Sequence, residues 1–173
     1  MAGQLIQVNT ATVTVATPSV TLTGIDSDDV YMVTLNNVQC DTDVTNLYVQ
    51  VTASGTAQNT ANYDWAKKTL RANTTFADSA NTNKTYSQVN TFLSMGTALG
   101  ESMHGIQYLY NFNNASEYSF ATDELAFMDY AATNLIGGQG GWVYTVAEAH
   151  DGVHYTFSTG NIASGTFTLY KVV

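Results

Sequence analysis

The chain has 173 residues, enough for one domain with a sizeable core, and carries five basic and fourteen acidic residues, a formal charge of −9. Binding a phosphate backbone requires clustered Lys and Arg, and the only such group is Lys67, Lys68 and Arg71, so no nucleic-acid partner is expected. The start, MAGQLIQ, does not resemble a signal peptide, and no run approaches the roughly 18 apolar residues of a membrane helix. We therefore expect a protein that is cytosolic when made and has no membrane partner.

The N-terminal 25 residues alternate Val or Leu with Thr on both sides of the only proline, Pro18. Alternation with a period of two marks a strand on a sheet face, so this segment is predicted to form two short strands or one bent arm. An arm of this kind could pair with a neighbouring subunit through its edge, or it could be an ordinary strand of its own sheet.

Two further alternating runs extend from Tyr31 to Leu35 and from Leu47 to Val51, with a predicted turn over residues 36–45 between them. The second run has one apolar and one polar face, as expected for an antiparallel sheet with a solvated side. The segment Ser54-Gly55-Thr56 is predicted to end it.

Residues 57–104 are the least regular part of the chain. Residues 63–70 are predicted to form a short strand. Residues 72–84 are rich in Asn, Thr and Ser and are predicted to be a loop. Tyr86, Val89, Leu93 and Met95 have the spacing of a helix, but the Ser, Thr, Asn and Gly residues around them disfavour one, so a strand is predicted near Gln88 to Met95.

Stronger alternation returns in the C-terminal half, with strands predicted from Ile106 to Phe112 and from Tyr118 to Phe127. Residues 137–141, GGQGG, are predicted to be a flexible loop, after which Trp142 to Val146 resume the alternation. The pair Asp151-Gly152 gives a turn signal before the last two strands.

The last twenty residues, HYTFSTGNIASGTFTLYKVV, are predicted to place the end of the chain inside a sheet. Phe167 and Leu169 share a strand face that we assign to the core, whereas Thr166 and Thr168 lie on the opposite, water-tolerant face. Counting all runs gives about eight to ten short strands without a sustained helix, which predicts an all-β, antiparallel two-sheet sandwich of jelly-roll type.

Three strings resemble a known family: YMVTLNNV at Tyr31–Val38, NLYVQVTAS at Asn46–Ser54 and FSTGNIASGTFTLY at Phe157–Tyr170. The chain resembles small jelly-roll structural proteins of tailed-bacteriophage virions over roughly residues 29–173. The resemblance implies a virion protein, either a head decoration or cement protein that stabilises the capsid surface, or a tail-fibre or receptor-binding component that recognises host glycan. It also implies the major capsid protein or other virion proteins as partners.

Two features bear on this choice. The chain has no long coiled-coil shaft, which favours decoration of the head. The N-terminal strands and the many aromatic residues offer pairing edges and apolar area, so we expect a homo-oligomer, and specifically a trimer. One jelly-roll domain is expected to span residues 1–173, with residues 1–25 as an N-terminal arm.

Metal binding has two candidate locations. The loop at residues 24–29, GIDSDD, offers three carboxylates to calcium but lacks the glycine and glutamate offsets of an EF-hand. His150 and His154 bracket the predicted turn and, with Glu148, could meet on adjacent strands, but no metal-binding histidine spacing is present. Solvated turns are the preferred interpretation of both, so we expect no metal and no cofactor.

Catalytic groups are sparse. Asp123, Glu124 and Glu101 could supply the carboxylates of a glycosidase, but adjacent strand residues point to opposite faces, so Asp123 and Glu124 cannot act together. Cys40, the single cysteine, is interpreted as a partly buried thiol. The sequence has no nucleophile elbow and no phosphate loop, and we expect no enzyme activity.

Three aromatic residues, Tyr63, Trp65 and Trp142, are the candidates for a glycan or interface site. Sugars stack on exposed aromatic faces, while Tyr and Trp are equally suited to a subunit interface or a sandwich core. The sequence leaves these three alternatives open.

Overall fold

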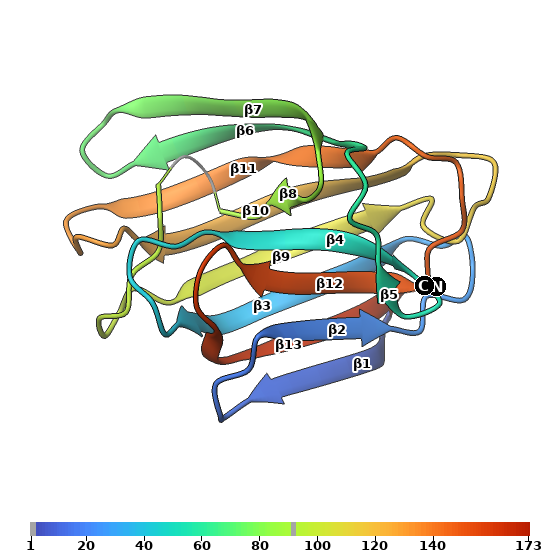
Figure 1. The fold of residues 1–173 in the computed structure, drawn as a ribbon, viewed down its shortest axis with the longest axis horizontal. Helices are drawn as coiled ribbons and strands as arrows, with labels where there is room; N and C mark the ends of the chain where they lie inside the picture. The colour runs from blue at the N-terminus through green and yellow to red at the C-terminus, as the bar shows by residue number, and fades with distance from the viewer. Residues whose placement is uncertain (1–2, 91–92) are drawn as a thin grey trace.

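Antiparallel strands in two stacked sheets make up the structure (Figure 1). The computed structural model describes residues 3–90 and 93–173, a part of the chain that contains 13 strands and no helix. The strands are β1 (Leu5–Val13), β2 (Ser19–Thr23), β3 (Tyr31–Cys40), β4 (Leu47–Ala53), β5 (Thr56–Ala57), β6 (Tyr63–Arg71), β7 (Phe76–Lys84), β8 (Ser87–Gln88), β9 (Met103–Tyr110), β10 (Ser119–Met128), β11 (Leu135–Tyr144), β12 (Gly152–Phe157) and β13 (Ile162–Val172). The predicted all-β, antiparallel two-sheet sandwich is confirmed.

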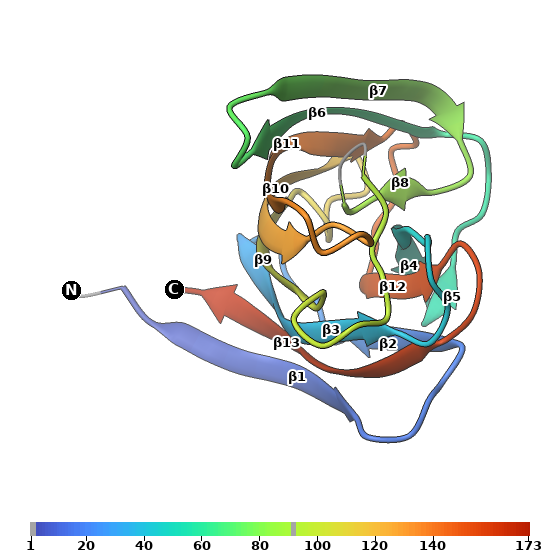
Figure 2. The ribbon, with the colours of Figure 1, turned by 90° about the vertical axis from the view of Figure 1, so that its left-hand side faces the viewer.

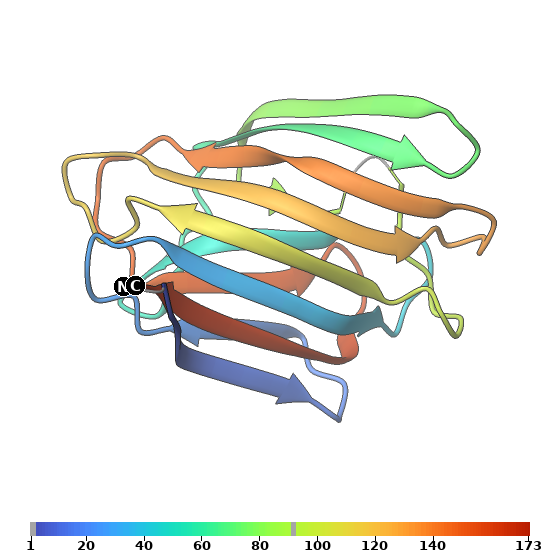
Figure 3. The ribbon, with the colours of Figure 1, turned by 180° about the vertical axis from the view of Figure 1, so that it is seen from behind.

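The larger sheet has eight strands in the order β1-β13-β3-β9-β10-β11-β6-β7. The smaller sheet has the order β2-β12-β4-β5, and β8 also pairs with β4. Figure 2 shows the larger sheet curving around the smaller one, and Figure 3 shows the larger sheet from its outer side. Three strand pairs are nested along the chain: β6–β11 lies within β4–β12, which lies within β3–β13, and successive pairs alternate between the sheets.

The core fills the space between the sheets with alternate side chains from each strand. Phe167 and Leu169 of β13 are fully buried there, as predicted, and the ring centroid of Phe167 lies 5.2 Å from that of Tyr155 on β12. Thr168 lies on the opposite face, but its hydroxyl is 2.5 Å from that of Thr10 on β1, and it is only 5% exposed. The outer face of β13 is thus partly covered by the neighbouring strand.

The N-terminal segment divides between the two sheets of its own chain. β1 pairs with β13 at the edge of the larger sheet, and β2 pairs with β12 at the edge of the smaller one. The turn predicted at Asp151-Gly152 is wrong because β12 begins at Gly152 and pairs with β2 and β4. The Asp151 carboxylate instead accepts hydrogen bonds from Thr52 Oγ1 at 2.7 Å and from the Gly55 amide at 2.8 Å.

The glycine-rich segment at residues 137–141 is a strand and not the predicted loop, since it forms the middle of β11. Its glycines allow close approach between strands. A Cβ on Gly140 would collide with the Ala66 carbonyl oxygen, and one on Gly141 would lie 2.7 Å from the Ala121 carbonyl oxygen. Glycine is needed here because the strands pack closely. A glycine-rich sequence alone does not distinguish such a strand from a flexible loop.

The loop predicted for residues 72–84 is confirmed for residues 72–75 and wrong for the rest, because Phe76 to Lys84 form the edge strand β7. An edge strand that is exposed on both faces has no side to bury, so its sequence need not alternate apolar with polar residues. The polar sequence of β7 is therefore like that of a loop. The strand predicted near Gln88 to Met95 is reduced to β8 and a single bridge between Met95 and Thr45. Residues 91–92 of that prediction lie outside the described residues. β3 continues through the predicted turn as far as Cys40.

Charge is divided unevenly between strands and loops. The strands contain four acidic and all five basic residues, a net +1, and the connections contain the other ten acidic residues, which together give the −9 of the chain. Hydrogen bonds between loops place six of these acids at one end of the sandwich: Asp26, Asp28, Asp29, Glu117, Glu148 and Asp151. Asp41, Asp43, Glu101 and Asp129 belong to the loops of the other end. The sheet faces are nearly neutral and both ends are acidic.

We expect Leu169→Ala to lower the free energy of unfolding by about 2–5 kcal/mol, because it removes fully buried methyl groups and leaves a cavity. Thr166→Ala, on the opposite and partly exposed face of β13, should change it by no more than about 0.5 kcal/mol. Urea unfolding of both variants measures the difference, and equal losses would contradict the register described for β13.

Candidate functional site

The outer face of the larger sheet carries several exposed apolar side chains. Alternation along β9 and β10 turns Ile106, Tyr108 and Phe120 outward, and these side chains remain 37%, 38% and 43% exposed. Tyr110 lies opposite Phe120 in the register of the two strands, so the aromatic residues occupy adjacent rows. Exposed aromatic groups on a sheet face are typical of contact sites for proteins or sugars.

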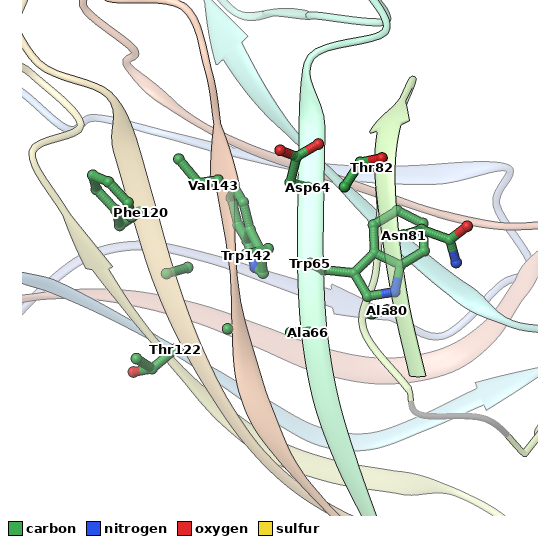
Figure 4. Close-up of a pocket in the computed structure, with 12 residues that line it drawn as sticks. Asp64, Trp65, Ala66, Ala80, Asn81, Thr82, Phe120, Thr122, Trp142 and Val143 are labelled. Carbon is green, nitrogen blue, oxygen red and sulfur yellow. The ribbon is translucent and has the colours of Figure 1, made fainter. Parts of the chain in front are cut away.

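A groove of about 520 Å³ runs across β10, β11, β6 and β7 on this face (Figure 4). The bottom of the groove is formed by one cross-strand row of three small residues, Gly141, Ala66 and Ala80. Their short side chains leave the space open. The adjacent row supplies Phe120 and Val143 as an apolar wall. The groove depends on glycine and alanine at consecutive positions of three strands.

A second depression lies beside the groove over β9, β10 and β11, and it is more polar. Ile106 and Tyr108 line one side, and Gln139 Nε2 donates a hydrogen bond of 3.2 Å to the Glu124 carboxylate on the other. Aromatic and amide groups therefore lie within one shallow surface. Sequence reasoning missed these residues because the same alternation fits either strand face, and only the pairing shows which one is outside.

The three aromatic residues proposed from sequence lie in the core. Tyr63, Trp65 and Trp142 are 0%, 5% and 3% exposed, so their rings are not available for stacking on a sugar. The Tyr63 hydroxyl donates a hydrogen bond of 2.7 Å to the Gln58 carbonyl and accepts one of 3.0 Å from the Val51 amide. Their role is to fill the sandwich, which is one of the alternatives that the sequence allowed.

A buried ion pair lies on the inner side of the larger sheet. The Lys67 ammonium on β6 contacts the Asp123 carboxylate on β10, and both side chains are 1% exposed. The two residues are separated by β11, where Gly140 is paired with both of them in the strand register. A Cβ at Gly140 would lie 2.7 Å from Lys67 Cγ, so glycine is needed where the lysine side chain crosses the strand. The expected basic cluster is thus divided, with Lys67 inside and Lys68 outside.

Further hydrogen bonds extend this ion pair to the smaller sheet. Gln107 Nε2 donates to Asp123 Oδ1 at 2.5 Å, and the Tyr155 hydroxyl on β12 donates to Gln107 Oε1 at 2.5 Å. Lys67 Nζ also donates to the Val89 carbonyl at 3.1 Å. Burial lowers the pKa of Lys67 while Asp123 opposes the shift, and burial raises the pKa of Tyr155. The network connects both sheets, and its burial favours a structural role.

Ser119, His150 and Glu148 have the composition of a serine hydrolase triad. Ser119 Oγ lies 2.7 Å from His150 Nδ1, and His150 Nε2 lies 3.1 Å from Glu148 Oε1. Ser119 and His150 are both fully buried, however, so the hydroxyl is not accessible to a substrate. His154 lies elsewhere, on β12, where its Nδ1 is 2.7 Å from Thr21 Oγ1. The predicted proximity of the two histidines across a turn is therefore wrong.

The acidic loop at residues 24–29 does not gather its carboxylates around one point. Asp26 accepts a hydrogen bond of 3.0 Å from the Tyr31 hydroxyl, and Asp28 accepts one of 2.8 Å from Asn114 Nδ2. Asp29 forms a 2.7 Å ion pair with Lys171, whose hydrogen bond lowers the pKa of Asp29. Among the described residues, no group of three or more His, Cys, Asp or Glu residues is arranged to hold a metal ion.

The other residues considered from sequence are separated in space. Asp123 is buried and Glu124 is exposed, as their opposite strand faces predict. Glu101 is buried in a loop, where its carboxylate accepts a 2.7 Å hydrogen bond from the Ala98 amide. Cys40 is buried, and burial raises its thiol pKa to about 11, which disfavours the reactive thiolate.

No protein-family model and no curated protein matches this chain. In the described residues, no helix has the length and apolar character needed to cross a membrane.

We expect Lys67→Met to lower the free energy of unfolding by about 3–5 kcal/mol, because it leaves the Asp123 carboxylate buried without its cation. The double variant Lys67→Met/Asp123→Asn should recover most of this loss, since the amide that replaces the carboxylate is uncharged and can still accept the hydrogen bond from Gln107. Urea unfolding at neutral pH measures both. A double variant as unstable as Lys67→Met would show that the lysine packing, and not the unpaired charge, dominates.

We expect stability to fall as the pH is lowered below about 6.5, the ordinary pKa of histidine. Burial lowers the pKa of His150 in the folded state, against an opposing effect of Glu148. The folded state therefore binds a proton less readily than the unfolded state, and the stabilisation from neutral His150 is lost as the pH falls through its folded pKa. Burial lowers the pKa of His154 as well, so both histidines contribute to this loss.

Unfolding in urea at stepped pH tests this expectation. His150→Gln should be less stable at pH values near neutrality but should show a shallower decline in acid. His104→Gln, a substitution at an exposed position of β9, should keep the wild-type decline. An unchanged slope in the His150 variant would show that this residue is not the source of the acid sensitivity.

Proposed function

We propose that this chain is a structural protein of a tailed-bacteriophage virion, made in the host cytoplasm and bound to the capsid surface as a head decoration or cement protein. The main observation in support is that the three sequence segments that resemble this family lie next to each other in the structure. Tyr31–Val38 lies in β3, Asn46–Ser54 contains β4, and Phe157–Tyr170 extends from β12 through β13. β3 pairs with β13 and β4 pairs with β12, so strings far apart in sequence form adjoining parts of the two sheets.

The nested strand pairs support the jelly-roll form of the sandwich. A jelly roll is an antiparallel ribbon wound so that successive pairs alternate between two sheets. The pairs β3–β13, β4–β12 and β6–β11 follow this scheme, and the β9–β10 hairpin adds two strands to the larger sheet. The likeness between the strings and the virion family is thus accompanied by a topology compatible with that family's fold.

The charge distribution also favours a coat role. Ten acidic residues lie in the loops at the two ends of the sandwich, which gives the protein no affinity for packaged DNA and keeps copies soluble at high local concentration. The outer face of the larger sheet offers Tyr108 and Phe120 on a nearly neutral surface, which suits contact with a capsid protein. Binding through this face would leave the acidic ends at the sides of the contact.

One observation favours the alternative, a tail-fibre or receptor-binding component. The exposed Tyr108 ring lies in the same depression as Gln139 and Glu124, and an aromatic ring beside amide and carboxylate groups is suited to stack on and hydrogen-bond a host glycan. The same surface would then contact sugar in place of capsid protein. The identity of the bound partner therefore distinguishes the two functions.

We expect Phe120→Asp to weaken binding to cognate phage heads assembled without this protein by about tenfold or more, because it places a charge in the centre of an apolar contact. Tyr130→Asp is the matched control, since Tyr130 is also 43% exposed but follows β10 in a loop at one end of the sandwich. Cosedimentation with heads measures binding of the wild type and both variants.

The outcomes separate the two functions. Loss of head binding in the Phe120 variant alone supports decoration through the outer face. If the wild type does not bind heads but adsorbs to host-envelope glycan, and Phe120→Asp abolishes this adsorption, the result would support receptor binding and contradict head decoration. Equal effects of the two substitutions would exclude the outer face as the binding surface.

A further inference from the structure

One side of the sandwich is built entirely from uncharged residues. The first charged residue of the chain is Asp26, so both β1 and β2 lack Asp, Glu, Lys, Arg and His. These two strands form edges of the two sheets. In the part of the chain that the structure describes, β1 pairs only with β13, so backbone N–H and C=O groups along its other side face away from the sheet.

Sheet edges of this kind usually carry a protective feature, such as a charged side chain or a proline, because an open edge pairs readily with another strand. The opposite edge of the same sheet has one: β7 contains Asp78, which forms an ion pair of 2.7 Å with Lys68, and Lys84. β1 has nine residues without a charge or proline, and its Leu5 and Ile6 side chains are 53% and 49% exposed. The two edges differ in the feature that normally prevents pairing.

We propose that β1 is the surface through which a second copy of this chain binds, by antiparallel pairing of β1 with β1 around a two-fold axis. The two eight-stranded sheets would then join into one sheet of sixteen strands. A two-fold pairing of identical strands closes at two copies, which differs from the trimer expected from the sequence. The role of this dimer on a capsid rests on the proposed function, whereas the pairing itself is a property of the free protein.

The register of β1 locates the contact. Its pairing with β13 shifts between Gln7 and Asn9, which marks a bulge, and the regular run from Asn9 to Val13 follows. Thr10 and Thr12 are exposed on the outer face of this run, and their hydroxyls lie 2.5 Å and 3.4 Å from those of Thr168 and Thr166 on β13. Pairing centred on this run would extend the threonine rows from one copy into the next without burying a charged group.

The absence of charge on β1 favours a second copy of this chain as the partner that binds there. Each copy carries −9, and its unbalanced acids lie in the end loops, so two copies repel when charged surfaces meet. The β1 side adds no charge to the contact. A strongly basic or acidic partner would find no opposite charge on this strand, whereas a second β1 offers an equally neutral edge with free backbone donors and acceptors.

Sedimentation equilibrium over a range of protein concentrations tests the pairing. We expect the wild type to dimerise reversibly, and Thr12→Lys to raise the dimer dissociation constant by about tenfold or more, since the two lysines would lie near each other on one face of the joined sheet, beside the two-fold axis. Thr82→Lys on β7 is the matched control, the same substitution at an exposed position of the other edge strand, and should leave dimerisation unchanged. Mixing Thr12→Lys with Thr12→Glu protein should restore dimers, because opposite charges then lie near each other.

Three results would overturn the proposal: a wild type that stays monomeric at every concentration, a trimer, or a dimer that responds to Thr82→Lys and not to Thr12→Lys. Thr10→Lys, a substitution at the other exposed threonine of this run, replaces Thr12→Lys if that variant does not keep the wild-type urea midpoint. None of these measurements involves phage heads. A dimer that fails to bind heads would reject the proposed function and leave the pairing intact.

Discussion

The buried ion pair between Lys67 and Asp123 connects three neighbouring strands of the larger sheet. It joins β6 to β10 across the intervening strand β11, and its hydrogen-bonded extension through Gln107 reaches Tyr155 in the smaller sheet. Two charges removed from water stabilise a fold only when each has its partner in place. These contacts form only when β6, β11 and β10 pair in the observed register and the smaller sheet lies in its observed position over them. The network therefore favours this one arrangement of the sandwich over shifted ones.

The requirement extends to residues that carry no charge. Gly140 lies between Lys67 and Asp123 in the strand register, and any side chain there would occupy the path of the lysine. A slip of β10 by one residue would bring Glu124 to the inner face and expose Asp123, leaving the lysine opposite a longer acid. The inner face of the larger sheet thus uses its charges to specify strand order, while the smaller sheet supplies mainly apolar packing.

Sequence patterns predicted the fold class and most strands because those features depend on local alternation. Phe167 and Leu169 could be assigned to the core from their own strand. β7 and the glycine-rich part of β11 could not, since their strand character comes from neighbours: β7 exists because β6 offers it an edge, and Gly140 makes room for a lysine from a much earlier part of the chain. The exposed aromatic residues of β9 and β10 were not predicted for the same reason. Alternation distinguishes the two faces of a strand but does not show which face packs against the other sheet.

Three potentially reactive side chains of the interior, Ser119, His150 and Lys67, are held in buried contacts, so any partner must be bound at the surface. Ser119 and His150 are sealed in the core, and Lys67 is held by Asp123, so the described interior offers no accessible reactive group among them. Three kinds of surface remain: acidic ends, the aromatic outer face of the larger sheet, and the neutral β1 edge. The outer face and the edge lie on different sides of the sandwich, with β13 and β3 between β1 and the aromatic strand β9. In the arrangement we propose, one copy pairs with another through β1 while its aromatic face stays free for a different partner, because the two surfaces do not overlap.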